Sequence, residues 1–355
     1  MILDIHQLTR RFGNVTANDS VSLQVRAGQL SGLLGHNGAG KTTLVSQIVG
    51  LLRPDSGSLH VAGIEAIRRP ALARRAVALQ TQSTASLDGL TPRLAITLAA
   101  RLRGLSARDS RAASARLLEE LDLGPWADRA ARPEGGGLSG GVRRLTTLAM
   151  ALAAPVPLLV LDEPTNDVDA ARRRLLWSAL RRRADDDGTA VLVVTHNVNE
   201  AESVVDELTV LDRGRVVASG SPAQLRARAL GEKAEIDAEG AGGYDDTLRL
   251  TLRLPGEPEP APTDAAAEPR QEERRREEPH REALGLHLPE QLEVRGSVVV
   301  GRRVILTLPA SRAGEAVAWS TGQRAAGVIE DYTLGPASLE DAYLALTAPK
   351  EETLA

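Results

Sequence analysis

A glycine-rich segment near the start of the chain, GHNGAGKT at residues 35–42, lies between an apolar run, Leu30–Leu34, and a helical pattern. It matches the G-x-x-x-x-G-K-[ST] phosphate-binding loop in the strand, loop and helix setting that this motif requires. The glycines let successive backbone amides point at phosphate oxygens, and the following helix adds its positive end. A glycine-rich turn without a ligand is the alternative, but it explains neither the flanking elements nor the lysine. The segment predicts an α/β nucleotide-binding domain.

The side chains of this loop have separate predicted roles in binding a nucleotide. Lys41 supplies a mobile positive charge for the β- and γ-phosphates, and the Thr42 hydroxyl is suited to ligate Mg²⁺. Lysine is scarce in this arginine-rich chain, so a lysine at the motif position is informative. The residues of the loop predicted to bind the nucleotide are Gly35, Asn37, Gly38, Ala39, Gly40, Lys41, Thr42 and Thr43.

A second motif, PLLVLDE at residues 157–163, predicts a buried strand that ends in two carboxylates. Asp162 is suited to orient Mg²⁺, and Glu163 is placed to polarise an attacking water as a general base. Acidic residues at the end of a strand are by themselves more often simple strand termination. Their pairing with the phosphate loop favours hydrolysis of the bound nucleotide.

A third motif, LSGG at residues 138–141, begins a helical pattern. A serine and two glycines at a helix start form a backbone-amide cradle for an anion, because the amides and the helix dipole point outward. The alternative is a serine N-cap beside a glycine loop. The position of the motif, roughly twenty residues before the PLLVLDE strand, favours the anion cradle.

Together these motifs resemble the ATP-binding subunit of ABC transporters over about residues 1–228. In that family two such domains face each other head to tail, and each ATP lies between the phosphate loop of one subunit and the LSGG of the other. The resemblance implies that Ser139, Gly140 and Gly141 contact the γ-phosphate of ATP held by a second ATPase subunit, in a homodimer. ATP and Mg²⁺ are the implied cofactors.

The resemblance assigns three further residues. His196, after a buried strand pattern, stands at the position of the switch histidine that holds the γ-phosphate; the alternative is a polar strand end. Phe12, the only phenylalanine, stands where the family stacks an aromatic ring on adenine; the alternative is core filling. The register of VALQTQ selects Gln82 over Gln80 as the glutamine that touches Mg²⁺ or the attacking water.

Two departures from the family pattern concern the contacts between subunits. Val142 takes the last place of the signature, usually Gln or Met, but the anion contacts come from the preceding residues. The usual S-G-L-D after the second motif is Asn166-Asp167-Val168-Asp169 here. Asp169 keeps the final carboxylate, whereas Asp167 in place of glycine leaves the geometry of that loop open.

Short β-branched runs alternate with longer Ala, Leu and Arg stretches up to about residue 228, as in an α/β domain. We expect a P-loop NTPase fold of ABC type, with a helical subdomain at about 90–150 that includes the helical pattern Pro92–Leu123. The predicted strands are Val21–Val25, Leu30–Leu34, Leu158–Asp162, Val191–Thr195 and Leu208–Asp212.

The composition changes after residue 230, and we expect a small α+β C-terminal domain over residues 229–354. Residues 255–278 contain no large apolar side chain, which predicts a disordered linker of mixed charge. Around this linker, the patterns predict a strand at Thr247–Leu254, a hairpin at Leu292–Leu308 and a helix at Ser338–Leu346.

The segment PASLEDAYLALT, residues 336–347, resembles the closing segment of the ATPases that serve ABC-2-type exporters of drugs, antibiotics and polysaccharides. An ordinary amphipathic helix is a compatible explanation. The leading hypothesis is an ATPase subunit that closes a dimer on ATP and drives drug or antibiotic efflux by a separate integral membrane permease. A non-transport or regulatory ABC ATPase is the alternative.

The composition and the motif count exclude several other classes of protein. The chain has no cysteine, which excludes a disulfide scaffold or a thiolate metal site, and its net charge of −4 gives no bias toward nucleic acid. Translation factors of the superfamily carry two phosphate loops, and this chain has one. No segment has the pattern of a membrane span or a secretory signal. We therefore expect a cytoplasmic protein, held at the inner face of the cell membrane by the permease.

Overall fold

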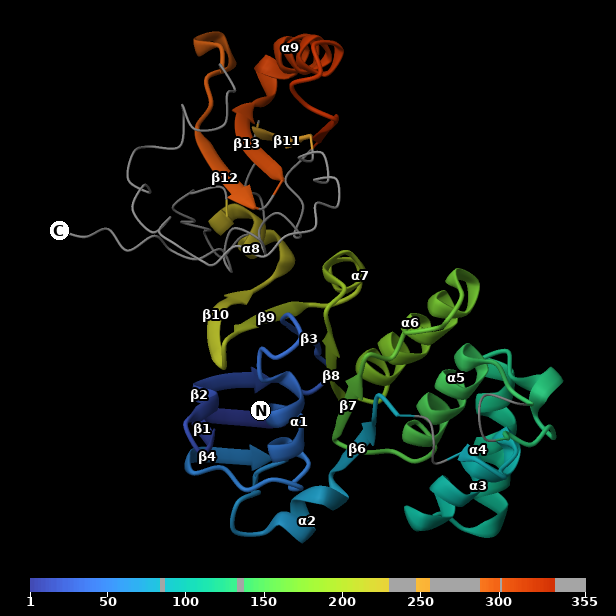
Figure 1. Ribbon diagram of the computed structural model, residues 1–355. Helices are drawn as coiled ribbons and strands as arrows, with labels where there is room; N and C mark the ends of the chain where they lie inside the picture. The colour runs from blue at the N-terminus through green and yellow to red at the C-terminus, as the bar shows by residue number, and fades with distance from the viewer. Residues whose placement is uncertain (84–86, 133–136, 230–246, 256–287, 301, 336–355) are drawn as a thin grey trace, which may run out of the picture. The chain divides into compact units, whose positions relative to one another are not determined.

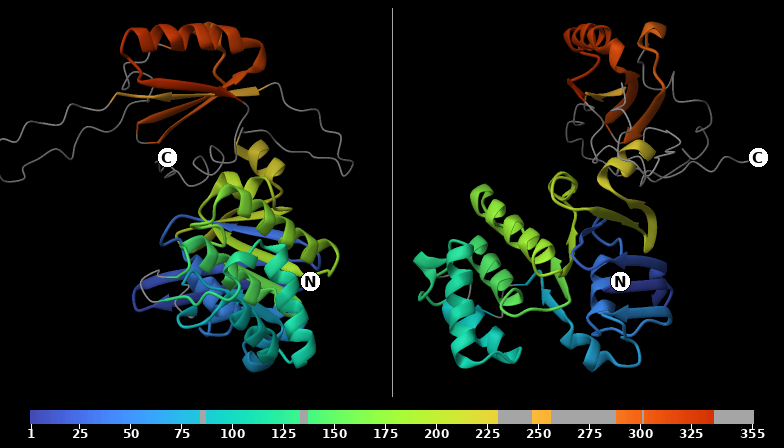
Figure 2. Two further views of the ribbon diagram at one scale, coloured as in Figure 1. Left: turned by 90° about the vertical axis from the view of Figure 1, so that its right-hand side faces the viewer. Right: turned by 180° about the vertical axis from the view of Figure 1, so that it is seen from behind.

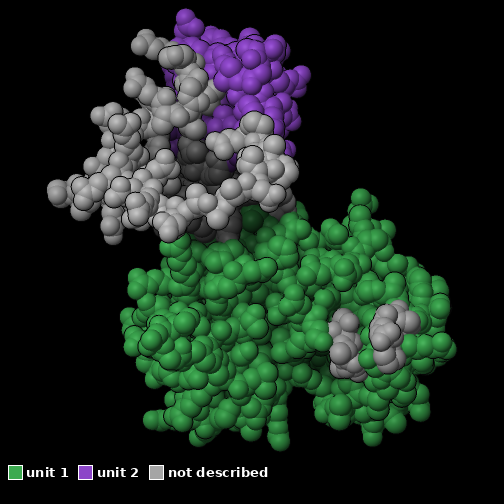
Figure 3. All heavy atoms as spheres, viewed as in Figure 1, with its two compact units in different colours: residues 1–225 green, residues 226–355 purple. Residues whose placement is uncertain are grey.

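In the computed structural model of the chain, the described residues are 1–83, 87–132, 137–229, 247–255, 288–300 and 302–335. Contacts divide the chain into two compact units, Met1–Leu225 and Arg226–Ala355 (Figure 3). All the predicted site residues belong to the first unit. None of the helices in the described part of the chain has the length and hydropathy that crossing a lipid bilayer requires.

The first unit contains two sheets (Figure 1). The antiparallel sheet contains, in spatial order, β2 (Val15–Val25), β1 (Leu3–Phe12), β4 (Ser56–Val61) and β5 (Ile64–Glu65). The larger sheet contains β10 (Arg215–Gly220), β9 (Glu207–Asp212), β3 (Leu30–Leu34), β8 (Ala190–Thr195), β7 (Leu158–Asp162) and β6 (Val77–Gln80). Its neighbouring strands pair in parallel, except β9 and β10. The predicted strands are found, and β2 begins at Val15 instead of Val21 because it pairs with β1 along its length.

Helix α1 (Lys41–Ile48) packs between the two sheets. One hydrophobic cluster joins Leu3 of β1 and Leu59 of β4 to Leu44 of α1 and to Leu192 of β8. Every residue of β3 and β8 is buried, as expected for central parallel strands covered on both faces. This packing holds the phosphate loop, which joins β3 to α1, against the core of the unit.

The remaining helices of the first unit are α2 (Pro70–Arg75), α3 (Pro92–Leu102), α4 (Ala107–Glu120), α5 (Gly140–Ala151), α6 (Ala170–Asp185), α7 (Val198–Glu202) and α8 (Pro222–Ala229), which crosses its boundary. Helices α3, α4 and α5 pack together beside β6 (Figures 1 and 2). Side chains cap their starts: the Thr91 hydroxyl accepts from the amide of Leu94, and the Ser106 hydroxyl accepts from that of Asp109. The region predicted to be helical, Pro92–Leu123, thus forms α3 and α4.

The second unit contains an antiparallel sheet with the order β12 (Gly296–Val300), β13 (Arg303–Pro309), β11 (Thr247–Arg253) and β14 (Asp331–Gly335). Helix α9 (Ala313–Ala325) packs on one face of this sheet (Figure 2). The predicted hairpin forms β12 and β13. The predicted helix at Ser338–Leu346 and all but the first residue of the predicted linker lie outside the described residues.

Candidate active site

The carboxyl ends of four adjacent parallel strands bring the predicted catalytic segments to one edge of the larger sheet. The phosphate loop follows β3, His196 follows β8, Asp162 ends β7, and Gln82 follows β6. The pairing register places the ends of these strands side by side, since Leu34 of β3 is opposite Thr195 of β8, and Asp162 of β7 is opposite Val194 of β8. This edge is where open α/β sheets bind ligands.

The backbone of the phosphate loop can be built only with glycine at two of its positions. Gly40 has φ +102, and a Cβ there would lie 2.2 Å from the carbonyl oxygen of Ala17. A Cβ on Gly35 would lie 2.5 Å from the carbonyl oxygen of Leu211. Asn18 braces the loop, because its side-chain amide donates to the Gly40 carbonyl at 3.2 Å. The loop is thus packed closely against two strands on its outer side.

Lys41 folds back over its own loop. Its Nζ donates to the carbonyl oxygens of Gly35 at 2.5 Å and His36 at 3.1 Å. Burial lowers the pKa of Lys41, and the charges of Glu163 and Asp162 oppose that shift. Both acceptors of the ammonium are neutral carbonyl oxygens, and the carboxylates of Glu163 and Asp162 act on it through their charge. Anionic phosphate oxygens at this loop are stronger acceptors for it.

Glu163 and His196 are in direct contact. Oε1 of Glu163 lies 2.7 Å from Nδ1 of His196 and accepts from the backbone amide of His196 at 3.1 Å. Oε2 accepts from the Thr195 hydroxyl at 3.1 Å. Glu163 is buried and has φ +50, a backbone conformation that residues other than glycine rarely adopt. The three hydrogen bonds hold its carboxylate at the sheet edge, where the sequence predicts a general base.

Asp162 is half-buried at the end of β7. Burial raises its pKa, the neighbouring Glu163 adds to that rise, and Lys41 and Arg144 oppose it. Among the described residues, no group of three or more His, Asp and Glu side chains is placed to hold a metal ion. The oxygen donors of Asp162 and Thr42 nevertheless fit Mg²⁺, which usually takes one or two protein oxygens and completes its shell with water and substrate phosphates.

The two glutamines after α2 lie in different surroundings. Gln80 is buried in β6 and donates to the carbonyl of Arg144 at 3.0 Å and the hydroxyl of Thr147 at 3.1 Å. Gln82 is exposed. The surroundings of Gln82 leave its side chain accessible to a ligand, while Gln80 joins the sheet to α5.

The signature segment begins α5. Ser139 is its N-cap, with a hydroxyl 3.4 Å from the amide of Val142, and Ser139 and Gly140 are exposed. Val142 is 1% exposed, so the residue that departs from the family pattern packs inward. Gly140 and Gly141 lie against Asp167 of the loop after β7.

Phe12 lies at the end of β1 and is 48% exposed, so it does not fill the core. The guanidinium of Arg10 lies 4.8 Å from the centre of its ring. Asp55 holds that guanidinium through a contact of 2.7 Å. The ring is therefore positioned at the surface by a cation–π contact.

Two residues near the site were not predicted. Arg144 of α5 is buried, donates to the carbonyl of Thr81 at 3.0 Å, and has its pKa lowered by burial against the charges of Asp167, Asp162 and Glu163. His36 has Nε2 2.8 Å from Asp212. In the sequence, these residues stand out only as part of an arginine pair after the signature and as a histidine inside the phosphate loop. Neither pattern predicts which residue the side chain contacts.

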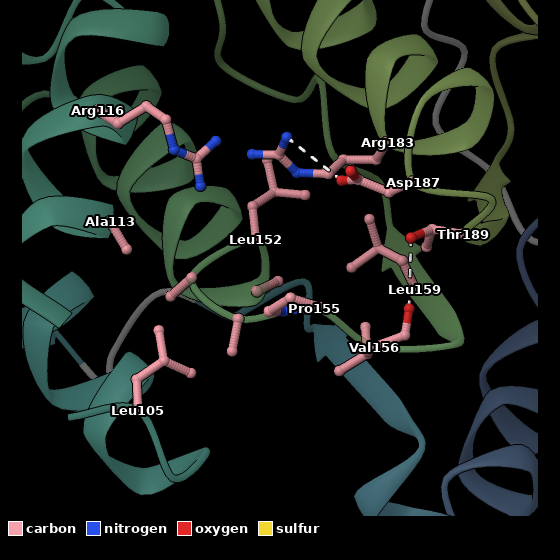
Figure 4. A pocket seen from close by; sticks show the side chains of 13 residues that line it. Leu105, Ala113, Arg116, Leu152, Pro155, Val156, Leu159, Arg183, Asp187 and Thr189 are labelled. Carbon is pink, nitrogen blue, oxygen red and sulfur yellow. Dashed lines mark hydrogen bonds and ion pairs between the residues drawn. The ribbon is translucent and has the colours of Figure 1, made fainter. Parts of the chain in front are cut away.

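A cavity of about 240 Å³ lies elsewhere, beside α4, α5 and α6 (Figure 4). Arg183 pairs with Asp187 at its rim, and the Thr189 hydroxyl donates to the carbonyl of Val156. None of the predicted site residues lines it. The nucleotide chemistry is therefore assigned to the sheet edge and not to this cavity.

Comparisons with known proteins agree with this geometry. The ABC transporter family model matches residues 18–166. The chain is 37% identical over 241 residues to daunorubicin resistance ATP-binding protein DrrA3 of Streptomyces coeruleorubidus, covering 68% of this chain and 75% of the relative. The chain belongs to the ABC transporter family. The predicted family membership and P-loop NTPase fold are confirmed, and the chain is an ATP-binding cassette with ATPase function.

Other members of the ABC transporter family show similar agreement. Nod factor export ATP-binding protein I of Burkholderia orbicola is 37% identical over 223 residues, which cover 63% of this chain and 72% of the relative. A solved ATP-binding subunit of an ABC transporter is 26% identical, with a TM-score of 0.59 over 64% of this chain and 93% of that one. The similarity thus extends over most of the first unit.

Proposed function

We propose that this ABC ATPase is the energy-coupling subunit of an ABC-2-type export system whose permease is a separate integral membrane protein. The observation that carries the proposal is the joint placement of Lys41, Asp162, Glu163 and His196 at one sheet edge, with Glu163 held against His196. The similarity to ATP-binding proteins of drug resistance and Nod factor export supports the export direction. Drug or antibiotic efflux is the cargo class we favour.

The proposed hydrolysis uses each group for one task. Lys41 exchanges its carbonyl acceptors for the β- and γ-phosphate oxygens of ATP. Glu163 takes a proton from the attacking water, and His196 holds the γ-phosphate beside it. Thr42, Asp162 and Gln82 are the proposed holders of Mg²⁺, which neutralises phosphate charge when bound. Phe12 stacks on adenine.

A second copy of the chain completes each proposed site. The exposed N-terminus of α5 presents the amides of Ser139, Gly140 and Gly141, which suit the γ-phosphate of ATP held by the partner subunit. ATP then joins two copies, because each nucleotide contacts both. We propose a homodimer that closes on ATP and opens after hydrolysis.

The permease is proposed to dock at α3. Leu94, Leu98 and Leu102 are exposed at four-residue spacing along this helix, which places them on one side of it. Leu98 and Leu102 line a groove of about 380 Å³ together with Thr81 and Met150. An apolar element of the permease seated there would lie beside the segment that leads to Gln82. This contact would hold a cytoplasmic subunit at the inner face of the membrane.

The experiment is efflux from cells that express this chain together with an ABC-2-type permease from the same genome. We expect export of a fluorescent drug with the wild-type chain and none with Glu163→Gln. Purified wild-type chain should hydrolyse Mg²⁺-ATP. Hydrolysis without any effect on efflux would favour a regulatory ABC ATPase instead, and absence of ATP turnover would contradict the catalytic assignments.

A further inference from the structure

Glu200 of α7 joins three segments that surround the catalytic groups. Its Oε2 accepts hydrogen bonds from the Thr165 hydroxyl at 2.8 Å and the Asn197 side-chain amide at 3.3 Å. Its Oε1 accepts from the indole nitrogen of Trp177 at 3.1 Å. Both carboxylate oxygens are thus used, by donors from three different parts of the chain.

Each of the three donors to Glu200 lies close in sequence to a residue with a proposed role in ATP hydrolysis or in the contact between subunits. Thr165 is buried two residues after Glu163, and Asn197 directly follows His196. Trp177 lies on α6, which begins directly after Asp169 at the end of the loop between subunits. One side chain therefore connects the segment of the general base, the segment of the switch histidine and the helix after the inter-subunit loop.

Part of this arrangement has an ordinary structural explanation. The Asn197 side chain caps α7 by accepting from the amide of Glu200 at 3.2 Å, and the carboxylate of Glu200 returns a contact to Asn197. A reciprocal cap of this kind stabilises a helix start. It does not explain the donors Thr165 and Trp177, which lie outside the helix.

The hydrogen bonds from Thr165 and Asn197 to Oε2 of Glu200 bear on the contact between Glu163 and His196. Glu163 has φ +50 and contacts His196 at 2.7 Å across two loops that are 33 residues apart in sequence. Oε2 of Glu200 accepts from both loops, so it fixes the distance between them a few residues beyond the reacting groups. Hydrogen bonds to an ionised carboxylate are stronger than those between neutral groups.

We propose that Glu200 is a positioning residue for ATP hydrolysis, which holds the Glu163 loop against the His196 loop and links both to α6 through Trp177. This inference rests on the proposed function. Glu200 acts through Glu163 and His196 and need not touch ATP. Its loss should therefore slow the chemical step and leave nucleotide binding unchanged.

The test is the steady-state kinetics of Glu200→Gln in the full-length chain, with Glu119→Gln on the exposed side of α4 as a matched control. Glutamine keeps the side-chain length but turns an NH₂ group toward a donor. We expect kcat to fall about 10- to 100-fold, the effect of a small misplacement of catalytic groups, while KM for ATP changes less than about twofold. The control should match the wild type.

A double variant tests whether Glu200 acts through Glu163. Adding Glu200→Gln to Glu163→Gln should cause no further loss of turnover, because residues that act as a unit are not additive. A kcat for Glu200→Gln within about twofold of the wild type would overturn the inference, as would a loss that lies in KM alone. An additive loss in the double variant would overturn it as well.

Thr165→Val decides the matter if Glu200→Gln does not fold, since it removes one donor and keeps the carboxylate. A fall in kcat at constant KM would support the inference, and unchanged kinetics would overturn it. If the wild-type chain itself shows no turnover, the proposed function and this inference fail together. Unchanged turnover in the variants removes the inference alone.

Discussion

A Cβ atom placed on Gly141 would lie 2.5 Å from the backbone oxygen of Asp167, and one placed on Gly140 would lie 3.2 Å from the Asp167 Cβ. The signature helix and the loop after β7 are therefore in direct contact within one chain. Asp167 itself has φ +63, a conformation for which glycine is better suited. The departure from the family pattern thus lies at the point where two segments meet that are proposed to face a second subunit.

Replacing Gly141 with alanine should displace the Asp167 loop, because the added methyl group meets a backbone atom that cannot rotate away. We expect a loss of about 1–3 kcal/mol in the free energy of unfolding, measured by urea denaturation, together with a loss of ATP-dependent dimerisation. Gly124→Ala is the control, since nothing lies within 4 Å of its added Cβ. Wild-type stability in Gly141→Ala would contradict the close packing.

Replacing Glu163 with glutamine should stop hydrolysis and preserve ATP binding. The general base is lost, so phosphate release should fall about 10²- to 10⁴-fold, while Lys41 and the loop remain intact. Light scattering after size-exclusion chromatography should show a dimer that persists with Mg²⁺-ATP. Turnover close to that of the wild type would assign the base to another residue.

Asp162→Asn should stabilise the chain in the absence of nucleotide. Burial and Glu163 raise the pKa of Asp162 above its ordinary value of 3.8, so its contribution to stability is present at acidic pH and is lost as the pH rises through the raised pKa. At neutral pH the folded wild type contains an ionised, partly buried carboxylate, which lowers its free energy of unfolding, and the neutral asparagine does not. We expect the melting temperature of the variant to be higher by about 2–4 °C, the shift for roughly 1 kcal/mol.

The pH dependence is the control for that prediction. The difference in melting temperature between Asp162→Asn and the wild type should shrink as the pH is lowered, since Asp162 then becomes neutral in the wild type as well. Added Mg²⁺-ATP should stabilise the wild type more than the variant. A constant difference across the acidic range would show that the charge of Asp162 is not its cause.

Phe12→Ala should weaken ATP binding without destabilising the fold, because the ring is half-exposed and base stacking contributes about 1–3 kcal/mol. Calorimetry should show a dissociation constant for ATP raised about 5-fold or more. Phe12→Trp should restore it, and the affinity for inorganic triphosphate should not change. A large loss of stability with unchanged ATP affinity would instead assign Phe12 to packing.

The sequence by itself determined the local elements. The phosphate loop, the buried strand before Asp162 and the glycine signature are each defined by residues close together in the chain, where backbone conformation and hydrogen bonding follow from residue type. Four of the five parallel strands, β3, β7, β8 and β9, could likewise be predicted from apolar runs, whereas β6 was not predicted. From these patterns, the catalytic segments could be expected at the carboxyl ends of strands.

Only the tertiary structure decided which side chains meet there. The contact of Glu163 with His196, the packing of Gly141 on Asp167 and the three donors around Glu200 join residues from separate segments. Such pairs depend on strand order, register and side-chain rotamers, none of which leaves a periodic signal in the sequence. The sequence thus identified the nucleotide chemistry, and the fold determined how its groups are held in place.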